Sequence, residues 1–211
     1  MLLAIRQGSA QDTADKAIEL LNRGVAPASL FDAYLAGAGE LLMRAPGILS
    51  LHATTFTNAL HYAWHHCGDE ETRKILILQN ASFLPLFRGN SQDKGLHVDE
   101  LEPSPLETKG AEAVAEIFAE VSKDRVSASR KMMAYLKEGD PKPLVDTARR
   151  MIFLKGRDSH DYKFSSAVLE DYRHLSPVWR DRYLAASVFN LRGSGAADNQ
   201  LVKRTRAALQ A

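Results

Sequence analysis

A histidine and a lysine stand three residues apart at the start of a predicted helix, at His160 and Lys163. Residues with this spacing share one face of a helix. A lysine ammonium is costly to bury on a partly apolar face unless it is paired, neutral or chemically modified. His52 lies on the apolar side of another predicted helix. The pattern therefore predicts that His52, His160 and Lys163 supply ligands to one buried metal centre.

Each of these residues also has an ordinary structural interpretation. His52 is compatible with a core histidine that is hydrogen-bonded to the backbone or to a threonine. Asp158 is suited to cap the helix that carries His160, and Lys163 is able to lay its aliphatic stem along an apolar surface. The residue types alone leave both interpretations open.

Three further histidines are weaker candidates for metal ligands. His61 and His65 have the i, i+4 spacing with which two imidazoles bind one ion in zinc proteases, but Tyr62 stands where those enzymes have a glutamate. Both histidines fall on the polar half of their helix, opposite His52, which predicts a solvated face or a wet cleft. His97 lies in a predicted loop, from which it is free to reach other elements.

The composition favours a globular protein and disfavours several classes of function. Of the 211 residues, 45% are hydrophobic and 25% are charged, which is typical of a chain with an ordinary core. Lys and Arg number 27 against 26 Asp and Glu, so we expect no nucleic-acid or membrane partner. The single cysteine, Cys67, excludes an internal disulfide and a cysteine-based metal site. No signal or membrane segment stands out, and we expect a cytoplasmic protein.

Helical spacing with capping residues recurs along the chain and predicts an all-α fold, a multi-helix bundle of about nine or ten helices. Ser9 is predicted to cap one helix and Pro27 to open the next. The helix that follows Asp69 is apolar nearly all round and is predicted to be the central buried one. Residues 89–109 are predicted to form a long polar loop. Further helices are expected over residues 48–67, 110–123, 125–137, 143–155, 159–174, 177–191 and 200–211.

We expect residues 1–211 to form a single all-helical domain, either complete in itself or the C-terminal half of a longer protein. The start of the chain is apolar, at Leu2, Leu3, Ala4 and Ile5, which is unusual for a free terminus. This favours a partner chain or a preceding segment, and we therefore expect a homo- or hetero-oligomer.

Two segments resemble the questin oxidase-like proteins. Leu51 to Thr55 is similar to that family's internal histidine motif, a histidine followed by small and hydroxyl residues on an apolar helix. The remaining likeness is to the family's C-terminal pattern, at Asp158, His160, Lys163, Phe164, Ala167, Tyr172, Pro177, Tyr183, Leu184, Ala185 and Ala186. Together the two segments cover about a third of the chain.

The resemblance implies an all-helical oxygenase with a mononuclear non-haem iron ion, acting on an aromatic or polyketide-type small molecule. Position by position, it implies His52, His160 and Lys163 as iron ligands, with the lysine carboxylated. A carbamate turns the cationic side chain into an oxygen donor, and its formation needs a neutral amine, which burial favours. Imidazoles are suitable ligands for iron.

The chain departs from the family pattern in its length. Members of the family are about twice as long, and their N-terminal half contributes further histidines, whereas no histidine precedes His52 here. Four explanations remain open. The chain is the C-terminal half, a partner chain completes the centre, His61, His65 or His97 supplies the missing ligands, or the site has decayed into packing.

The leading hypothesis is thus a non-haem iron oxidoreductase whose pocket is lined by Phe56, Trp64 and Tyr162, although each of these aromatics is also typical of an ordinary core. A second hypothesis is a non-catalytic α-helical scaffold that docks a partner chain through exposed apolar surface. A hydrolase with a metal-bound water is a third, without support from a nucleophile motif.

Overall fold

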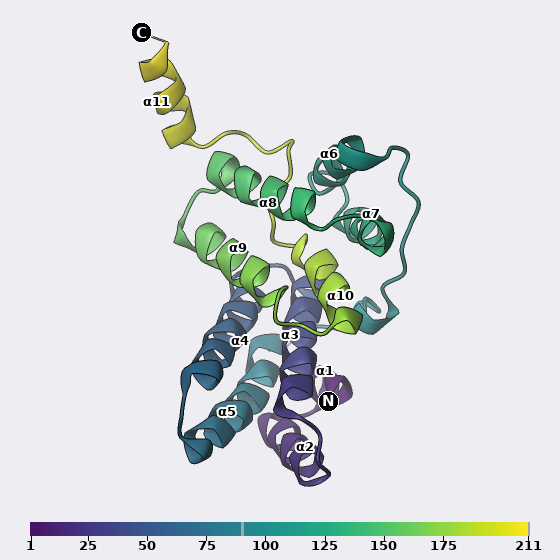
Figure 1. Cartoon of the computed structure of the whole chain (residues 1–211), viewed down its shortest axis with the longest axis vertical. Coiled ribbons are helices and arrows are strands. Elements are labelled where there is room, and N and C mark those ends of the chain that lie inside the picture. Colours follow the sequence, from purple (N-terminus) through teal and green to yellow (C-terminus); the bar gives the residue numbers. More distant parts are fainter. Residues whose placement is uncertain (90, 211) are drawn as a thin grey trace.

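The chain is helical throughout the residues that its computed structural model describes, 1–89 and 91–210 (Figure 1). This confirms the predicted all-α multi-helix bundle. The helices are α1 (Leu2–Gln7), α2 (Ala10–Asn22), α3 (Pro27–Arg44), α4 (Ile48–His66), α5 (Glu70–Arg88), α6 (Gly110–Glu120), α7 (Arg125–Glu138), α8 (Lys142–Lys155), α9 (Ser159–Asp171), α10 (Pro177–Ser187) and α11 (Gln200–Leu209), with a short 3₁₀ helix, η1 (Val98–Glu100).

The helix starts follow from local capping chemistry. Ser9 caps α2 in a capping box with Asp12, and Pro27 opens α3 at its first position, both as predicted. Asp158 caps α9 by accepting hydrogen bonds from the backbone N–H groups of His160 and Asp161. The Asp158 cap fixes where α9, the helix that carries His160, begins.

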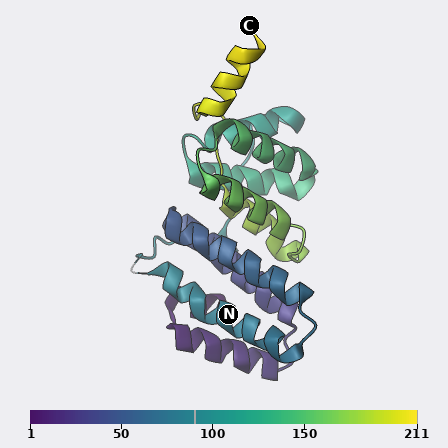
Figure 2. The same cartoon turned by 90° about the vertical axis from the view of Figure 1, so that its left-hand side faces the viewer.

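The helices stack in layers along the long axis of the molecule (Figure 2). α5 packs between α2 on one side and the pair α3 and α4 on the other. The next layer contains α9, which packs on α4, and α10, which packs on α3. Beyond it lie α6, α7 and α8, and α11 extends from that end (Figure 1). Two apolar clusters form the core, and α3 contributes to both.

The central buried helix is α3, and the prediction that α5 holds this position was wrong. Most residues of α3 from Leu30 to Met43 are buried. Its glycines permit close approach, because a Cβ at Gly37 would lie 2.9 Å from Cδ1 of Ile5. On α5, by contrast, Phe83 and Leu86 are exposed. Apolar character alone therefore did not identify the helix that α1, α4, α5 and α10 surround.

The segment 89–109 is less polar in its contacts than predicted. It contains η1, whose first residue, Val98, is completely buried. The Val98 backbone N–H donates to the buried carboxylate of Glu40, which also accepts two hydrogen bonds of 2.6 Å from Arg6. Arg6 pairs with Asp99 as well, and hydrogen bonding to Glu40 raises the pKa of its guanidinium. Position 90 lies outside the described residues.

We predict that Glu40→Ala destabilises the protein by about 3 kcal/mol, because it leaves the Arg6 charge and the Val98 N–H without their buried acceptor. Urea denaturation measures this change. Glu19→Ala is the matched control, since Glu19 pairs only with exposed Lys16 and Arg23, and surface pairs contribute little. Equal midpoints for the two variants would show that the Glu40 network does not hold α1 and η1 on α3.

Candidate metal centre

Two groups of histidines lie along the packing interface between α4 and α9. Near the starts of both helices His52 faces His160, and near their ends Asn58 donates to Asp171. The second contact lies further along both helices than the first, so α4 and α9 run in the same direction. His61 is nine residues beyond His52, which is about 14 Å along a helix. The two groups therefore cannot ligate one ion.

His52 and His160 meet edge to face, with their ring centroids 5.6 Å apart. The predicted approach of these two histidines is thus present in the structure. Nδ1 of His160 lies 3.5 Å from the exposed capping carboxylate of Asp158. Lys163, one turn further along α9, is exposed to solvent. Lys163 therefore lacks the burial on which the predicted carboxylated lysine depends.

Most of the polar half of α4 is buried and does not form a solvated face, whereas at its far end His61 and exposed His65 line a pocket, the cleft alternative of the prediction. Ser50, Thr57 and His61 have little or no exposure, whereas Ile48 and Leu49 are exposed. The hydroxyl of Thr57 donates to the side-chain oxygen of buried Asn80 on α5, at 3.1 Å. Hydrogen bonds to neighbouring elements allow a polar face to lie in the interior. That face carries His61 into the interface with α9.

His61 is the centre of a second histidine group, which contains His65 and His174. Its Nε2 lies 3.0 Å from Nε2 of His65, one turn away on α4. The ring centroid of His174, in the turn after α9, lies 5.5 Å from the centroids of both other rings. His61 is only 6% exposed, while His65 and His174 are at the surface. The group thus has a buried base and an open side.

Asp171 lies behind His61 and is 1% exposed. Its carboxylate accepts hydrogen bonds from Nδ2 of Asn58 at 2.9 Å and from the hydroxyl of Tyr183 at 3.1 Å. Its Oδ1 is 3.9 Å from Nδ1 of His61, a contact longer than a hydrogen bond. Burial, and then this carboxylate, raise the pKa of Tyr183 well above its ordinary value, so the hydroxyl remains a donor.

The histidine group lines a pocket of about 260 Å³. Glu170 and Asp171 contribute to the same pocket from α9, and Asn58 from α4. Burial lowers the pKa of His65, and the proximity of His61 and His174 lowers it further. A depressed pKa keeps an imidazole neutral near pH 7, which is the form that binds metal ions.

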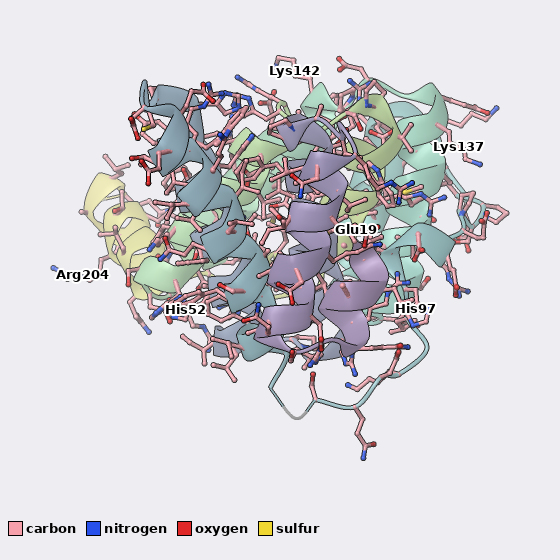
Figure 3. All side chains as sticks on the ribbon, turned by 90° about the horizontal axis from the view of Figure 1, so that it is seen from below. Glu19, His52, His97, Lys137, Lys142 and Arg204 are labelled. Atoms are coloured by element: carbon pink, nitrogen blue, oxygen red, sulfur yellow. The ribbon has the colours of Figure 1, made fainter. Side chains whose placement is uncertain are left out.

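The third candidate position, His97, is remote from both groups. Its Nε2 is 3.1 Å from Asp93 and its Nδ1 is 3.3 Å from Glu100. Pairing with Asp93 raises the pKa of His97. Figure 3 shows His52 and His97 on opposite sides of the molecule. His97 therefore supplies no ligand to either histidine group.

The three aromatics predicted to line one pocket lie in different surroundings. Phe56 stacks on Phe83 of α5 with ring centroids 5.1 Å apart. Trp64 lies beside the histidine group, and the guanidinium of Arg73 sits 4.3 Å from its ring centroid. Tyr162 faces a separate groove between α8 and α9.

Comparisons of the chain with family models, with curated proteins and with solved structures found no match. The likeness to questin oxidase-like proteins therefore stays a prediction. Over residues 1–89 and 91–210, none of the helices has both the length and the apolar character required to cross a bilayer.

His174 and Asp171 are the members of this group that sequence reasoning missed. His174 was assigned to the end of a helix, and only its position in the turn after α9 directs it towards α4. The useful signal was Asp171 and His174 three residues apart, because that spacing places a carboxylate and an imidazole on one side of a helix end.

The donor set of the second group is suited to a metal ion, although its side chains are not yet arranged around one. Among the described residues, no three His, Cys, Asp or Glu side chains are positioned to share an ion. Three imidazoles on a tetrahedral ion, at about 2.0–2.1 Å, place their ring centroids about 5 Å apart. The observed separations of 4.5, 5.5 and 5.5 Å are close to this value. Rotation of the exposed His174 ring is the adjustment that binding requires.

We predict that His65 titrates below the ordinary histidine pKa of about 6.5 in the folded protein. ¹H NMR of its ring resonance measures the midpoint. The folded state then binds fewer protons than the unfolded state, so this contribution to stability is present above pH 6.5 and is lost as the pH falls below it.

The variant His174→Ala removes one of the neighbouring histidines and is expected to raise the His65 midpoint without restoring it fully, because desolvation persists. His97→Ala is the control, since His97 is remote from the group and pairs with Asp93 and Glu100. A His65 midpoint at or above the ordinary value in the parent protein would contradict the described environment.

Proposed function

We propose that this chain is a metal-dependent enzyme whose ion is bound by His61, His65 and His174. The observation that carries the proposal is the 3.0 Å separation of the Nε2 atoms of His61 and His65, with the third imidazole beside them. Two lone pairs directed at one point favour either a shared proton or a shared cation. An ion satisfies both nitrogens, together with that of His174.

Asp171 supports this assignment as a buried carboxylate on the Nδ1 side of His61, 3.9 Å away. A histidine that ligates through Nε2 commonly directs its Nδ1–H towards a carboxylate, which fixes the tautomer and increases the basicity of the ligand. Asp171 is itself held by Asn58 and Tyr183, so it is a fixed buried charge. The same arrangement places net negative charge beside a cation that would otherwise be poorly solvated.

Imidazole ligands suit iron and zinc among the ions that proteins commonly bind. Three protein ligands leave at least one coordination position open. We propose iron, as the resemblance to questin oxidase-like proteins implies, and hence an oxidoreductase that acts on a small molecule. A bound iron ion with an open position supplies dioxygen chemistry, and the histidines of this chain hold and orient it.

The set of His52, His160 and Lys163 is a weaker fit to the same function. Two imidazoles lie at a suitable separation there, but the third residue is exposed. No buried carboxylate orients either imidazole, because Asp158 is itself at the surface. We therefore assign the metal to the other end of the α4–α9 interface.

A non-catalytic scaffold is the second candidate function, and it rests on a different observation. Ile48 and Leu49 at the start of α4, and Phe83 and Leu86 on α5, are exposed apolar side chains. Such side chains, when they gather on one surface, are typical of sites that dock a partner. This function requires no metal, so metal analysis separates the two candidates.

We predict about one iron or other transition-metal ion per chain in protein purified without chelator, measured by inductively coupled plasma mass spectrometry. His174→Ala is expected to lower the affinity for the ion by at least about tenfold, because it removes one of three ligands. His174 is exposed, so the variant is expected to keep the parent thermal midpoint.

The controls are His97→Ala, which is remote from the group, and His160→Ala, which tests the other pair. Both are expected to retain the ion. Loss of metal in His160→Ala with full retention in His174→Ala would transfer the centre to His52, His160 and Lys163. A folded parent protein that binds no transition metal would favour the scaffold.

A further inference from the structure

We infer that the groove between α8 and α9 binds an aromatic carboxylic acid, with the ring against Phe153 and Tyr162 and the carboxylate between Arg149 and Arg173. This inference deepens the proposed function, on which it rests for the role of the ligand as substrate. The binding itself requires no metal ion.

The groove has a volume of about 680 Å³. This volume lies within the range typical of small-molecule sites. One wall is the outer stripe of α9 from Tyr162 to Arg173, and the other is the part of α8 that carries Arg149 and Phe153. A stripe of this length spans about 17 Å at the rise of an α-helix. The groove is therefore suited to a ligand longer than a single ring.

Two aromatic rings form the end of the groove nearest the connection between the helices. Phe153 and Tyr162 lie with their ring centroids 5.9 Å apart and tilted. They are 65% and 37% exposed, which is high for aromatic side chains. A planar ring laid against them removes apolar surface from water and gains edge or offset contacts. This end of the groove therefore favours an aromatic group.

Two arginines direct positive charge to the middle of the groove. α8 and α9 are consecutive helices joined by a short turn, so they run in opposite directions. Side chains lean towards the N-terminus of their own helix. Arg149 therefore leans away from the turn that joins the two helices, towards the part of the groove that Leu169 and Arg173 line. Arg173 itself lies in the turn after α9. Paired guanidinium groups bind a carboxylate through parallel hydrogen bonds.

The acidic side chains nearby do not cancel this charge. Glu170 is the acidic residue among those that line the groove, against the two arginines. Asp146 on α8 lies 3.7 Å from Arg149, but both side chains are about half exposed. Such a pair is weak in water. A ligand carboxylate would complete the pairing of Arg173, for which the described residues provide no side-chain acceptor.

The groove leads to the histidine group. His174 and Glu170 line both this groove and the smaller histidine pocket. A carboxylate held at the level of Leu169 is five residues before His174 along the chain, about 7.5 Å at the rise of an α-helix. An ion bound by His174 would thus face the acid end of the ligand and not its aromatic ring.

The test is isothermal titration calorimetry of chelator-treated, metal-free protein with 3-phenylpropionate. The expected result is saturable binding, with at least about tenfold weaker binding of the neutral 3-phenylpropionamide. Arg149→Ala and Arg173→Ala are each expected to weaken binding of the acid about tenfold and to leave the amide unchanged. Arg204→Ala, on exposed α11, is the matched control and is expected to bind like the parent.

Four outcomes would overturn the inference. Equal binding of the acid and the amide would show that the groove does not recognise the carboxylate. Unchanged binding in Phe153→Ala would show that the ligand ring does not pack against Phe153. Tighter binding of phenyl phosphate than of the carboxylate would replace the carboxylic acid by a phosphate ester. Absence of any saturable binding by the folded, metal-free parent would also contradict it.

The same titrations keep this inference separate from the proposed function. If both hold, His65→Ala, which lies outside the groove, loses the metal and still binds the acid, and Arg149→Ala binds the acid more weakly and still binds the metal. Acid binding without metal binding in the parent protein would contradict the proposed function alone. Metal binding without acid binding would contradict the groove inference alone.

Discussion

The carboxylate of Asp171 is buried where α4, α9 and α10 meet, and the arrangement of these helices depends on how its charge is satisfied. Asn58 on α4 and Tyr183 on α10 donate hydrogen bonds to it. A buried carboxylate without donors is far more costly than the hydrogen bonds are favourable, so the three helices are held in one register. That register fixes the place of His61, four residues before His65 on the same helix.

The parallel alignment of α4 and α9 explains why histidines meet at both ends of this interface. The environments differ, however, because only the end near Asp171 combines a buried imidazole, a fixed carboxylate and two further histidines. The end with His52 and His160 is more open and has an exposed lysine nearby. Burial and charge thus distinguish two sites that have similar residue types.

Local chemistry predicted much of this fold. Ser9, Pro27 and Asp158 mark helix starts through side-chain or ring geometry that acts within one turn, so their effect is visible in the sequence. The mutual approach of His52 and His160 was also predicted.

Features that depend on distant partners were not predictable. The polar side of α4 was expected to face solvent, but donors and acceptors on α5 and α9 satisfy it in the interior. Gly37 marks the central helix only once Ile5 of α1 is known to pack on it. His174 joins the candidate centre through the turn after α9, which the helical pattern did not resolve.

The most direct test of the assigned metal centre is a crystal structure of the iron-loaded protein, with diffraction recorded at the iron absorption edge. The account predicts one anomalous peak per chain, at coordination distance from Nε2 of His61 and of His65 and from a ring nitrogen of His174. A peak between His52 and His160, or iron-loaded crystals with no peak near His61, would contradict it.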